Sequence, residues 1–233
     1  MGAALGWGAV AASSLVIGAL LGLARRWPDR QVGLVLAFGA GALISAVSFE
    51  LVQEGANVAG PGWVALGLAA GALTYYFVNE ALGRHESTGG AGTALALGAF
   101  LDGIPEQAVL GISLAEGGGV SVGLLVAIFV SNLPEAIGSA SEMRNGGIAP
   151  RRIRQLWIGV ALICVLAAGG GYAIADVTGG HLQAAVNGFA AGALLVMLVD
   201  EMIPSATRKF GQRAGLVTTL GFAVAAGLSG MSA

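Results

Sequence analysis

Residues 101–107 read L-D-G-I-P-E-Q, and residues 130–136 read V-S-N-L-P-E-A. Each stretch lies inside a long apolar run, and each places a proline directly before a glutamate. Proline removes a hydrogen bond from the interior of a helix, and a carboxylate at the centre of a membrane helix costs about 2.5–3.5 kcal/mol on insertion scales. Because acids inside membrane segments are normally functional, the two Pro-Glu stretches are the first candidates for a functional site.

The composition places the chain in a lipid bilayer. Hydrophobic residues make up 56% of the 233 residues and charged residues 10%, whereas a soluble domain carries about 25% charged residues. Apolar runs of about 20 residues, long enough to cross a bilayer, predict eight transmembrane helices at 3–24, 32–54, 62–82, 93–115, 120–142, 155–175, 182–204 and 214–231. We therefore predict an all-α membrane protein in which residues 1–233 form a single transmembrane domain.

The basic residues predict how these helices are oriented. All eleven fall in the first, third, fifth and seventh connections between helices: Arg25, Arg26, Arg30, Arg84, Arg144, Arg151, Arg152, Arg154, Arg208, Lys209 and Arg213. Because positively charged connections stay in the cytoplasm, we expect both termini to face outward from the plasma (cell inner) membrane. The first basic cluster follows the first helix, which indicates a retained span and not a cleaved signal peptide.

Other partners and sites find little support in the sequence. The sequence has no basic stretch of the kind that binds nucleic acid. Cys164 is the single cysteine, so neither a disulfide nor a CxxC metal site is available. The two histidines, His85 and His181, fall in connections, where we expect solvated surface groups.

Two segments of the chain resemble each other. A-F-G-A-G-A-L-I-S-A-V-S-F-E-L (37–51) aligns with G-F-A-A-G-A-L-L-V-M-L-V-D-E-M (188–202). At one constant offset the alignment pairs Phe38 with Phe189 and Glu50 with Glu201. In the predicted orientation the two helices run in opposite directions, as do the two Pro-Glu helices, and inverted repeats are typical of secondary transporters. The alternative is that helices rich in glycine and alanine resemble one another by composition alone.

Oxygen-bearing side chains of the Pro-Glu helices fall near the middle of the membrane. Asp102 and Glu106 are four residues apart and so share one helix face. Ser131 and Glu135 repeat this relation, with Asn132 nearby. Each proline also leaves a backbone carbonyl without its helical donor, which is tolerated at membrane depth where it lines a polar cavity. Two such helices facing each other predict an oxygen-rich cation site; the alternative is a structural kink with neutralised acids.

Two further acids lie away from the midplane. Glu50 is predicted toward the outside and Glu201 toward the inside. They are candidate pathway residues at the entrance and exit of an ion route, or interfacial groups that reach water.

At these residues the chain resembles the ZIP (Zrt/Irt-like) family of divalent-metal transporters. The resemblance rests on the two Pro-Glu motifs in the fourth and fifth helices, on the topology, and on A-G-A-L-L-V-M-L-V-D-E-M-I-P (191–204). It implies eight helices with both termini outside and a metal site built around H-N-x-P-E-G motifs. It also implies a transporter and not an enzyme, with no cofactor besides the transported ion. The composition, rich in glycine and alanine, suggests a prokaryotic-type member.

The ligands depart from the family pattern. Asp102 stands where the family has histidine, and Ser131 where histidine or glutamine is usual. Glu106, Asn132 and Glu135 match the family residues. The resemblance therefore implies one metal site formed by these five side chains. Imidazole suits zinc whereas carboxylates suit harder ions, so the family implies zinc, and the ligands favour a less selective choice that includes manganese, iron or cadmium.

Other readings stay open from the sequence. A member that has lost both motif histidines would bind or sense metal without moving it. An intramembrane metalloenzyme is a further alternative, although no histidine lies in a predicted membrane helix. Small-residue faces such as G-L-A-A-G-A (67–72) allow close helix contact within or between protomers, so a homodimer is open as well.

Overall fold

The computed structural model describes residues 1–83, 90–115, 122–175 and 179–230, and among them no strand occurs. Inside these ranges the side chains of some helical residues, including Asp102, Pro105 and Ser131, lie outside the described part of the structure. The uninterrupted helices are α1 (Gly2–Ala24), α4 (Pro61–Gly83), α5 (Gly90–Ala115), α6 (Val122–Asn145), α7 (Pro150–Ile174) and α10 (Ala214–Gly230).

Two helical stretches of the described chain contain a π-helical segment. The first consists of α2 (Asp29–Ser45), η1 (Ala46–Gln53) and α3 (Glu54–Ala59); the second consists of α8 (Gly180–Met197), η3 (Leu198–Met202) and α9 (Ile203–Phe210). A short 3₁₀ turn, η4 (Gly211–Arg213), leads from α9 into α10. π-helical turns are rare in proteins overall but are often found at functional sites. Both of the segments that the sequence alignment pairs contain one, so the two segments share a local backbone feature as well as sequence.

The predicted helix boundaries need correction in these same stretches. The helix predicted at 32–54 extends over Asp29–Ala59, and the helix predicted at 182–204 continues to Phe210. Each ends where a glycine takes a positive φ, Gly60 at 83° and Gly211 at 79°. Glycine adopts this left-handed conformation without steric cost, so these backbone positions and not the ends of the apolar runs terminate the helices.

The two Pro-Glu stretches do not end their helices. α5 continues through the 101–107 stretch, and α6 contains Pro134 in its interior. Proline still removes one backbone donor at each place, but the helices on both sides remain one element.

The helices are long and apolar. By length and composition, five stretches of the described chain can cross a membrane: Gly2–Ala24, Asp29–Ala59, Pro61–Ala81, Pro150–Ile174 and Gly180–Leu228. The last of these is 49 residues long and runs from α8 into α10. The secondary-structure elements of the described chain are thus all helical, and the chain has the composition of a multi-pass membrane protein.

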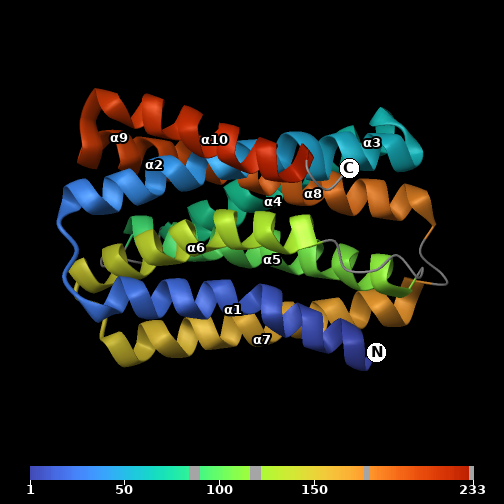
Figure 1. Ribbon diagram of the computed structural model, residues 1–233, viewed down its shortest axis with the longest axis horizontal. Helices are drawn as coiled ribbons and strands as arrows, with labels where there is room; N and C mark the ends of the chain where they lie inside the picture. Colours follow the sequence, from blue (N-terminus) through green and yellow to red (C-terminus); the bar gives the residue numbers. More distant parts are fainter. Residues whose placement is uncertain (84–89, 116–121, 176–178, 231–233) are drawn as a thin grey trace.

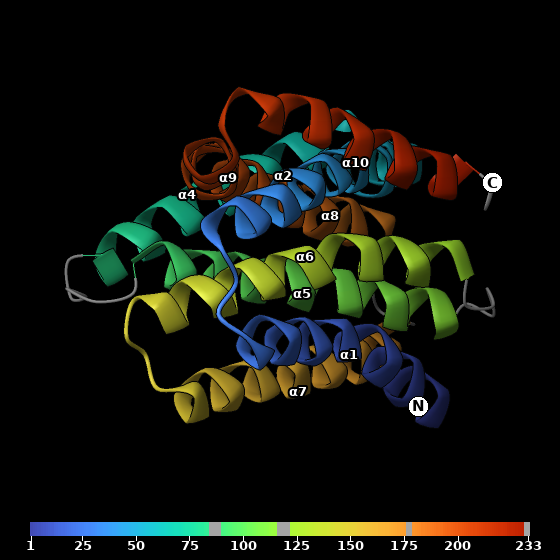
Figure 2. The same cartoon turned by 60° about the vertical axis from the view of Figure 1, so that its left-hand side comes forward.

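The bundle is layered, with α5 and α6 in the middle. On one side of them lie α1 and α7, and on the other lie α2, α4, α8 and α10 (Figures 1 and 2). α1 packs along α6 and α7 packs along α5, while α2 contacts α6 and α8 contacts α5. The two Pro-Glu helices also pack against each other, which brings both Pro-Glu stretches into the interior of the bundle.

The helices fall into two units, each with its own hydrophobic core. The first unit comprises α1, α5, α6 and α7, with a core that includes Leu15 and Trp157. The second unit comprises the stretches α2–α3 and α8–α9 with α4 and α10, and its core includes Leu36 and Tyr75. The units meet mainly where α5 and α6 contact α8 and α2. We call this contact the seam.

Helix pairs in the second unit repeat one close backbone contact. A Cβ added to Gly221 on α10 would lie 2.0 Å from the carbonyl oxygen of Phe38 on α2, and one added to Gly71 on α4 would lie 1.9 Å from that of Phe189 on α8. Phe38 and Phe189 are the residues that the sequence alignment pairs. α2 and α8 begin at opposite ends of the bundle (Figure 1), so the two aligned helices run in opposite directions.

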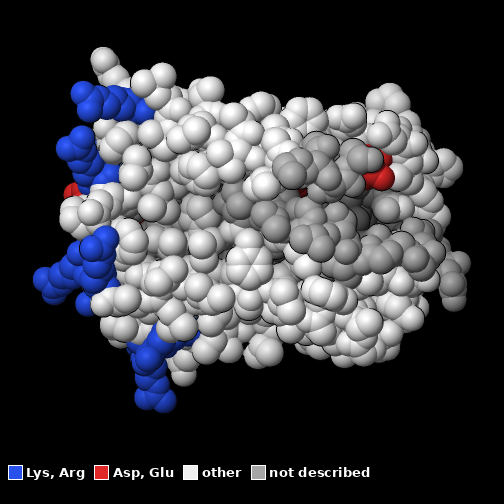
Figure 3. Space-filling view, in the orientation of Figure 1, with Lys and Arg blue, Asp and Glu red and all other residues white. Residues whose placement is uncertain are grey.

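Positive charge lies at one end of the bundle. Lys and Arg side chains gather at one end (Figure 3, left). The start of α1 and the end of α10 lie at the other (Figure 1, right). We call the end that carries the Lys and Arg residues the basic end. Both chain ends therefore lie on the side away from the positive charge.

Candidate metal site

Glu135 on α6 is the centre of the candidate site. Its side chain is 0% exposed, and neither carboxylate oxygen has a hydrogen-bond partner among the described residues. A buried carboxylate is strongly unfavourable unless a proton, donors or a cation compensate its charge. The position is therefore a candidate for binding a cation, or a proton, in the interior of the bundle.

Three helices meet at this carboxylate. A Cβ built on Gly98 of α5 would lie 3.4 Å from Glu135 Oε1 and 2.6 Å from Met197 Cγ on α8. Gly98 thus keeps free the space that a larger residue would fill beside the carboxylate. Met197 brings a thioether, a soft group, to the same place, and sequence reasoning missed it because a methionine in an apolar helix looks like any core residue.

Glu106 on α5 is the second carboxylate of the site. It is half-buried and lies within electrostatic range of Glu135. Neighbouring carboxyl groups disfavour each other's ionisation, and a bound cation would offset that cost. The structure therefore places the two glutamates of the Pro-Glu stretches on packed helices, α5 and α6, within electrostatic range of each other.

The remaining predicted ligands are placed only in part. Asn132 is buried, 2% exposed, on α6 less than one turn before Glu135. Asp102 and Ser131 lie on α5 and α6, but their side chains fall outside the described residues, so their predicted roles stay predictions. Among the residues whose side chains are described, no group of three or more His, Cys, Asp or Glu gathers at a possible metal site.

The two candidate pathway acids occupy the π-helical segments. Glu50 lies in η1 and Glu201 in η3, and both are half-buried. Asn79 Nδ2 on α4 donates to Glu201 Oε1 at 3.5 Å. The extra residue in a π turn shifts the side chains that follow it around the helix axis, and here it coincides with an acid in both aligned segments.

Tyr75 on α4 is a further buried polar residue near these acids. It is fully buried, 0% exposed, and its hydroxyl experiences the charges of Glu201, Glu135 and Asp200. Sequence reasoning did not single it out, since one tyrosine in the apolar T-Y-Y-F-V run carries no spacing signal. It is therefore within electrostatic range of both Glu135 and Glu201.

Other buried polar side chains lie outside this group. Gln107 on α5 is 1% exposed, and its Oε1 lies 3.3 Å from a Cβ built on Gly8 of α1. It therefore faces the α1 side of α5. Asn187 on α8 is 0% exposed, and its Cβ lies 3.2 Å from a Cβ built on Gly55 of α3. Neither contact reaches Glu135.

Comparison with known proteins gives one informative relative. Over 188 residues, 76% of its length, the chain is 29% identical to an Arabidopsis thaliana protein named "Putative zinc transporter". The matched stretch covers 30% of that protein, so the chain spans about a third of the length of this relative. No family model matches the chain.

Proposed function

We propose that the protein is a divalent metal transporter of the ZIP type that carries its ion past Glu135 and Glu106. The observation that carries the proposal is the Glu135 carboxylate, fully buried, without a hydrogen-bond donor among the described residues and beside a second carboxylate. A structural acid at this depth would be expected to have its oxygens hydrogen-bonded, whereas an ion-binding acid leaves them for the cation.

The membrane arrangement follows from the same proposal. All eight predicted helices cross the plasma membrane, with the basic end in the cytoplasm and both termini outside. The positive-inside rule supports this orientation, since Lys and Arg gather at the end away from the chain ends. The matched contacts of Phe38 and Phe189 support an inverted repeat that relates α2 and α10 to α8 and α4.

The route of the ion runs along the seam. Glu50 and Glu201 are the acids on its outer and inner sides, and both lie in π-helical segments, η1 and η3. Tyr75 supports a connection between the centre and the inner side, because it experiences the charges of both Glu135 and Glu201. The ion enters from the outside and leaves at the basic end.

The cargo is zinc or another transition metal, with manganese, iron and cadmium as competitors. The site consists of Asp102, Glu106, Ser131, Asn132 and Glu135, and lacks the family's imidazoles. Oxygen ligands discriminate less sharply for zinc than imidazole does. The printed name of the Arabidopsis relative, "Putative zinc transporter", supports zinc as the first ion to test.

Metal uptake by the purified protein in liposomes tests the proposal. Protein-containing liposomes should accumulate zinc from outside, and empty liposomes should not. Binding of zinc without uptake would instead identify a metal sensor. Neither binding nor uptake of zinc, manganese, iron(II) or cadmium would contradict the assignment of a metal protein altogether.

A further inference from the structure

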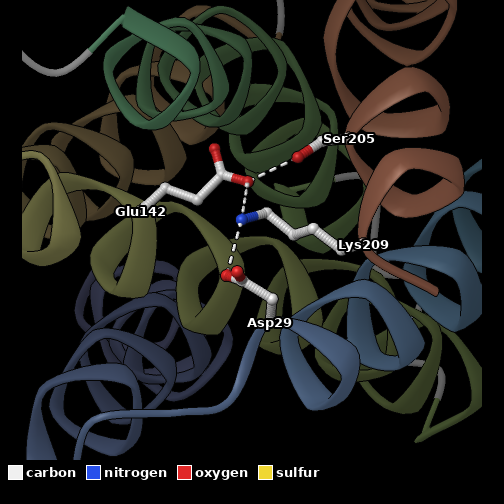
Figure 4. Close-up of polar contacts among 4 residues, drawn as sticks. All are labelled: Asp29, Glu142, Ser205 and Lys209. Carbon is white, nitrogen blue, oxygen red and sulfur yellow. Dashed lines mark hydrogen bonds and ion pairs between the residues drawn. The ribbon is translucent and has the colours of Figure 1, made fainter.

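A charged cluster joins the two units at the basic end of the bundle. Lys209 on α9 places its Nζ 3.1 Å from Asp29 Oδ1 at the start of α2 and 3.8 Å from Glu142 Oε1 on α6 (Figure 4). Ser205 Oγ, one turn before Lys209, donates a short hydrogen bond to the same Glu142 oxygen. Glu142 belongs to the first unit, and the other three side chains belong to the second. The cluster therefore crosses the seam.

The side chains of the cluster differ in their exposure to solvent. The Glu142 side chain is 8% exposed and that of Lys209 is 21% exposed, whereas that of Asp29 is 72% exposed. Glu142 Oε2 is buried without a hydrogen-bond partner among the described residues. The carboxylate thus depends on Lys209 and Ser205 for compensation of its charge while the seam is closed. Asp29 holds Lys209 from the solvent side.

The position of Glu142 relates the cluster to the ion site. Glu142 follows Glu135 by seven residues on α6, which places both on one face of the helix, about 10 Å apart along its axis. The same face meets the second unit between them: a Cβ on Gly138 would lie 2.2 Å from a methyl carbon of Leu36 on α2. Leu36 is 0% exposed. Any route from Glu135 to the basic end along this face passes Leu36 and then the cluster.

We propose that Glu142, Lys209 and Ser205 form a latch that closes the seam at the basic end and parts when the ion leaves there; the role in ion release rests on the proposed transport function. Bundle transporters open by motion of one unit against the other around the site. The two units have separate cores and meet along the seam, which is the arrangement that such a motion needs. A charged latch is suited to a seam that opens and closes, because the ionised groups are hydrated again when they separate at the membrane surface. An apolar contact would instead expose hydrophobic surface each time.

Cysteine reactivity at the seam tests the latch without reference to transport. In a Cys164→Ala background, Leu36→Cys reports opening beneath the cluster. Ala19→Cys, equally buried in the first unit at 1% exposed, reports general loosening. Lys209→Met removes both ion pairs and keeps the apolar stem. Arg213→Met removes an exposed charge in η4 and serves as the matched control.

The latch predicts a selective change. Lys209→Met should raise the reaction rate of Leu36→Cys with a small thiol reagent about tenfold, as expected when a closed state loses its bias toward one side of a two-state equilibrium. Arg213→Met should leave the rate unchanged, and Ala19→Cys should stay protected in every background. An unchanged Leu36→Cys rate in Lys209→Met overturns the latch, and so does an equal rise at Ala19→Cys.

A covalent closure tests the same proposal in the transporting protein. Glu142→Cys with Ser205→Cys, cross-linked by oxidation or by a short thiol cross-linker, should stop zinc uptake, and a reductant should restore it in the oxidised protein. Continued uptake by the cross-linked protein overturns the latch. Absence of uptake by the wild type contradicts the proposed function instead, and the cysteine reactivity still decides the latch.

Discussion

Gly221 on α10 lies so close to Phe38 on α2 that a Cβ on the glycine would stand 2.0 Å from the phenylalanine carbonyl oxygen. Gly71 and Phe189 repeat this contact between α4 and α8 at 1.9 Å. Backbones this close leave no room for a side chain, and small residues at such contacts are what allows membrane helices to pack tightly. The two helix pairs of the second unit are thus held by the same type of contact at matching positions.

The first prediction concerns these glycines. Gly221→Ala and Gly71→Ala should each destabilise the protein by about 1–3 kcal/mol, because the added methyl group overlaps a carbonyl oxygen. Gly215→Ala on α10 meets no atom within 4 Å and should be neutral or slightly stabilising. Thermal unfolding in one detergent measures all three variants. Equal melting temperatures for Gly221→Ala and Gly215→Ala would show that the helices separate more easily than the contact indicates.

Orientation in the membrane is the second prediction. In a Cys164→Ala background, Gly2→Cys at the start of α1 should react with a membrane-impermeant thiol reagent in intact cells. Gly146→Cys, in the turn between α6 and α7 at the basic end, should react only after the cells are opened. The division of charge between the ends is the physical reason. Labelling of Gly146→Cys in sealed cells would reverse the proposed topology.

The third prediction concerns the space beside the central carboxylate. Gly98→Ala places a methyl group 2.6 Å from Met197 Cγ and 3.4 Å from Glu135 Oε1. Displacement of the glutamate by a fraction of an ångström should lower zinc uptake about tenfold or more. The double variant Gly98→Ala with Met197→Ala removes the clash and should recover part of the rate. If the single variant transports at the wild-type rate, the ion does not pass this side of Glu135.

The fourth prediction concerns the choice of ion. Asp102→His with Ser131→His restores the family's nitrogen ligands and should shift competition uptake toward zinc and away from manganese. Uptake of labelled zinc against increasing manganese, in wild type and double variant, measures the shift. A wild type that already prefers zinc strongly, together with an unchanged double variant, would remove these two positions from the ion's direct ligands.

Much of the fold could be predicted from the sequence, because apolar runs long enough to cross a membrane must be helical there. The ends of two helices could not, since Gly60 and Gly211 stop them through backbone conformation and not through hydropathy. The π segments η1 and η3 likewise have no signal in composition. The alignment of Phe38 with Phe189 indicated related helices. Only the packing shows that the backbone carbonyl of each phenylalanine lies against a glycine of a neighbouring helix.

The candidate site was predictable where it depends on local spacing. The two Pro-Glu motifs indicated Glu106 and Glu135 because buried acids in membrane helices are costly. Met197 on α8 and Tyr75 on α4 come from other helices. They lie near the site only because α8 packs against α5, and α4 packs against α8, in the folded bundle. The pairing of Glu142 with Lys209 joins residues far apart in sequence and leaves no local signal at all.

Zinc uptake into liposomes by Glu135→Gln tests the central claim most directly. The substitution keeps the shape of the side chain and removes the charge that would hold the ion, so uptake should fall below about a tenth of the wild-type rate. Glu106→Gln should behave alike, and Glu54→Gln, exposed on α3, should transport as the wild type does. Comparable melting temperatures for all four proteins exclude misfolding as the cause. Wild-type uptake by Glu135→Gln would contradict the account and leave its buried carboxylate a structural group.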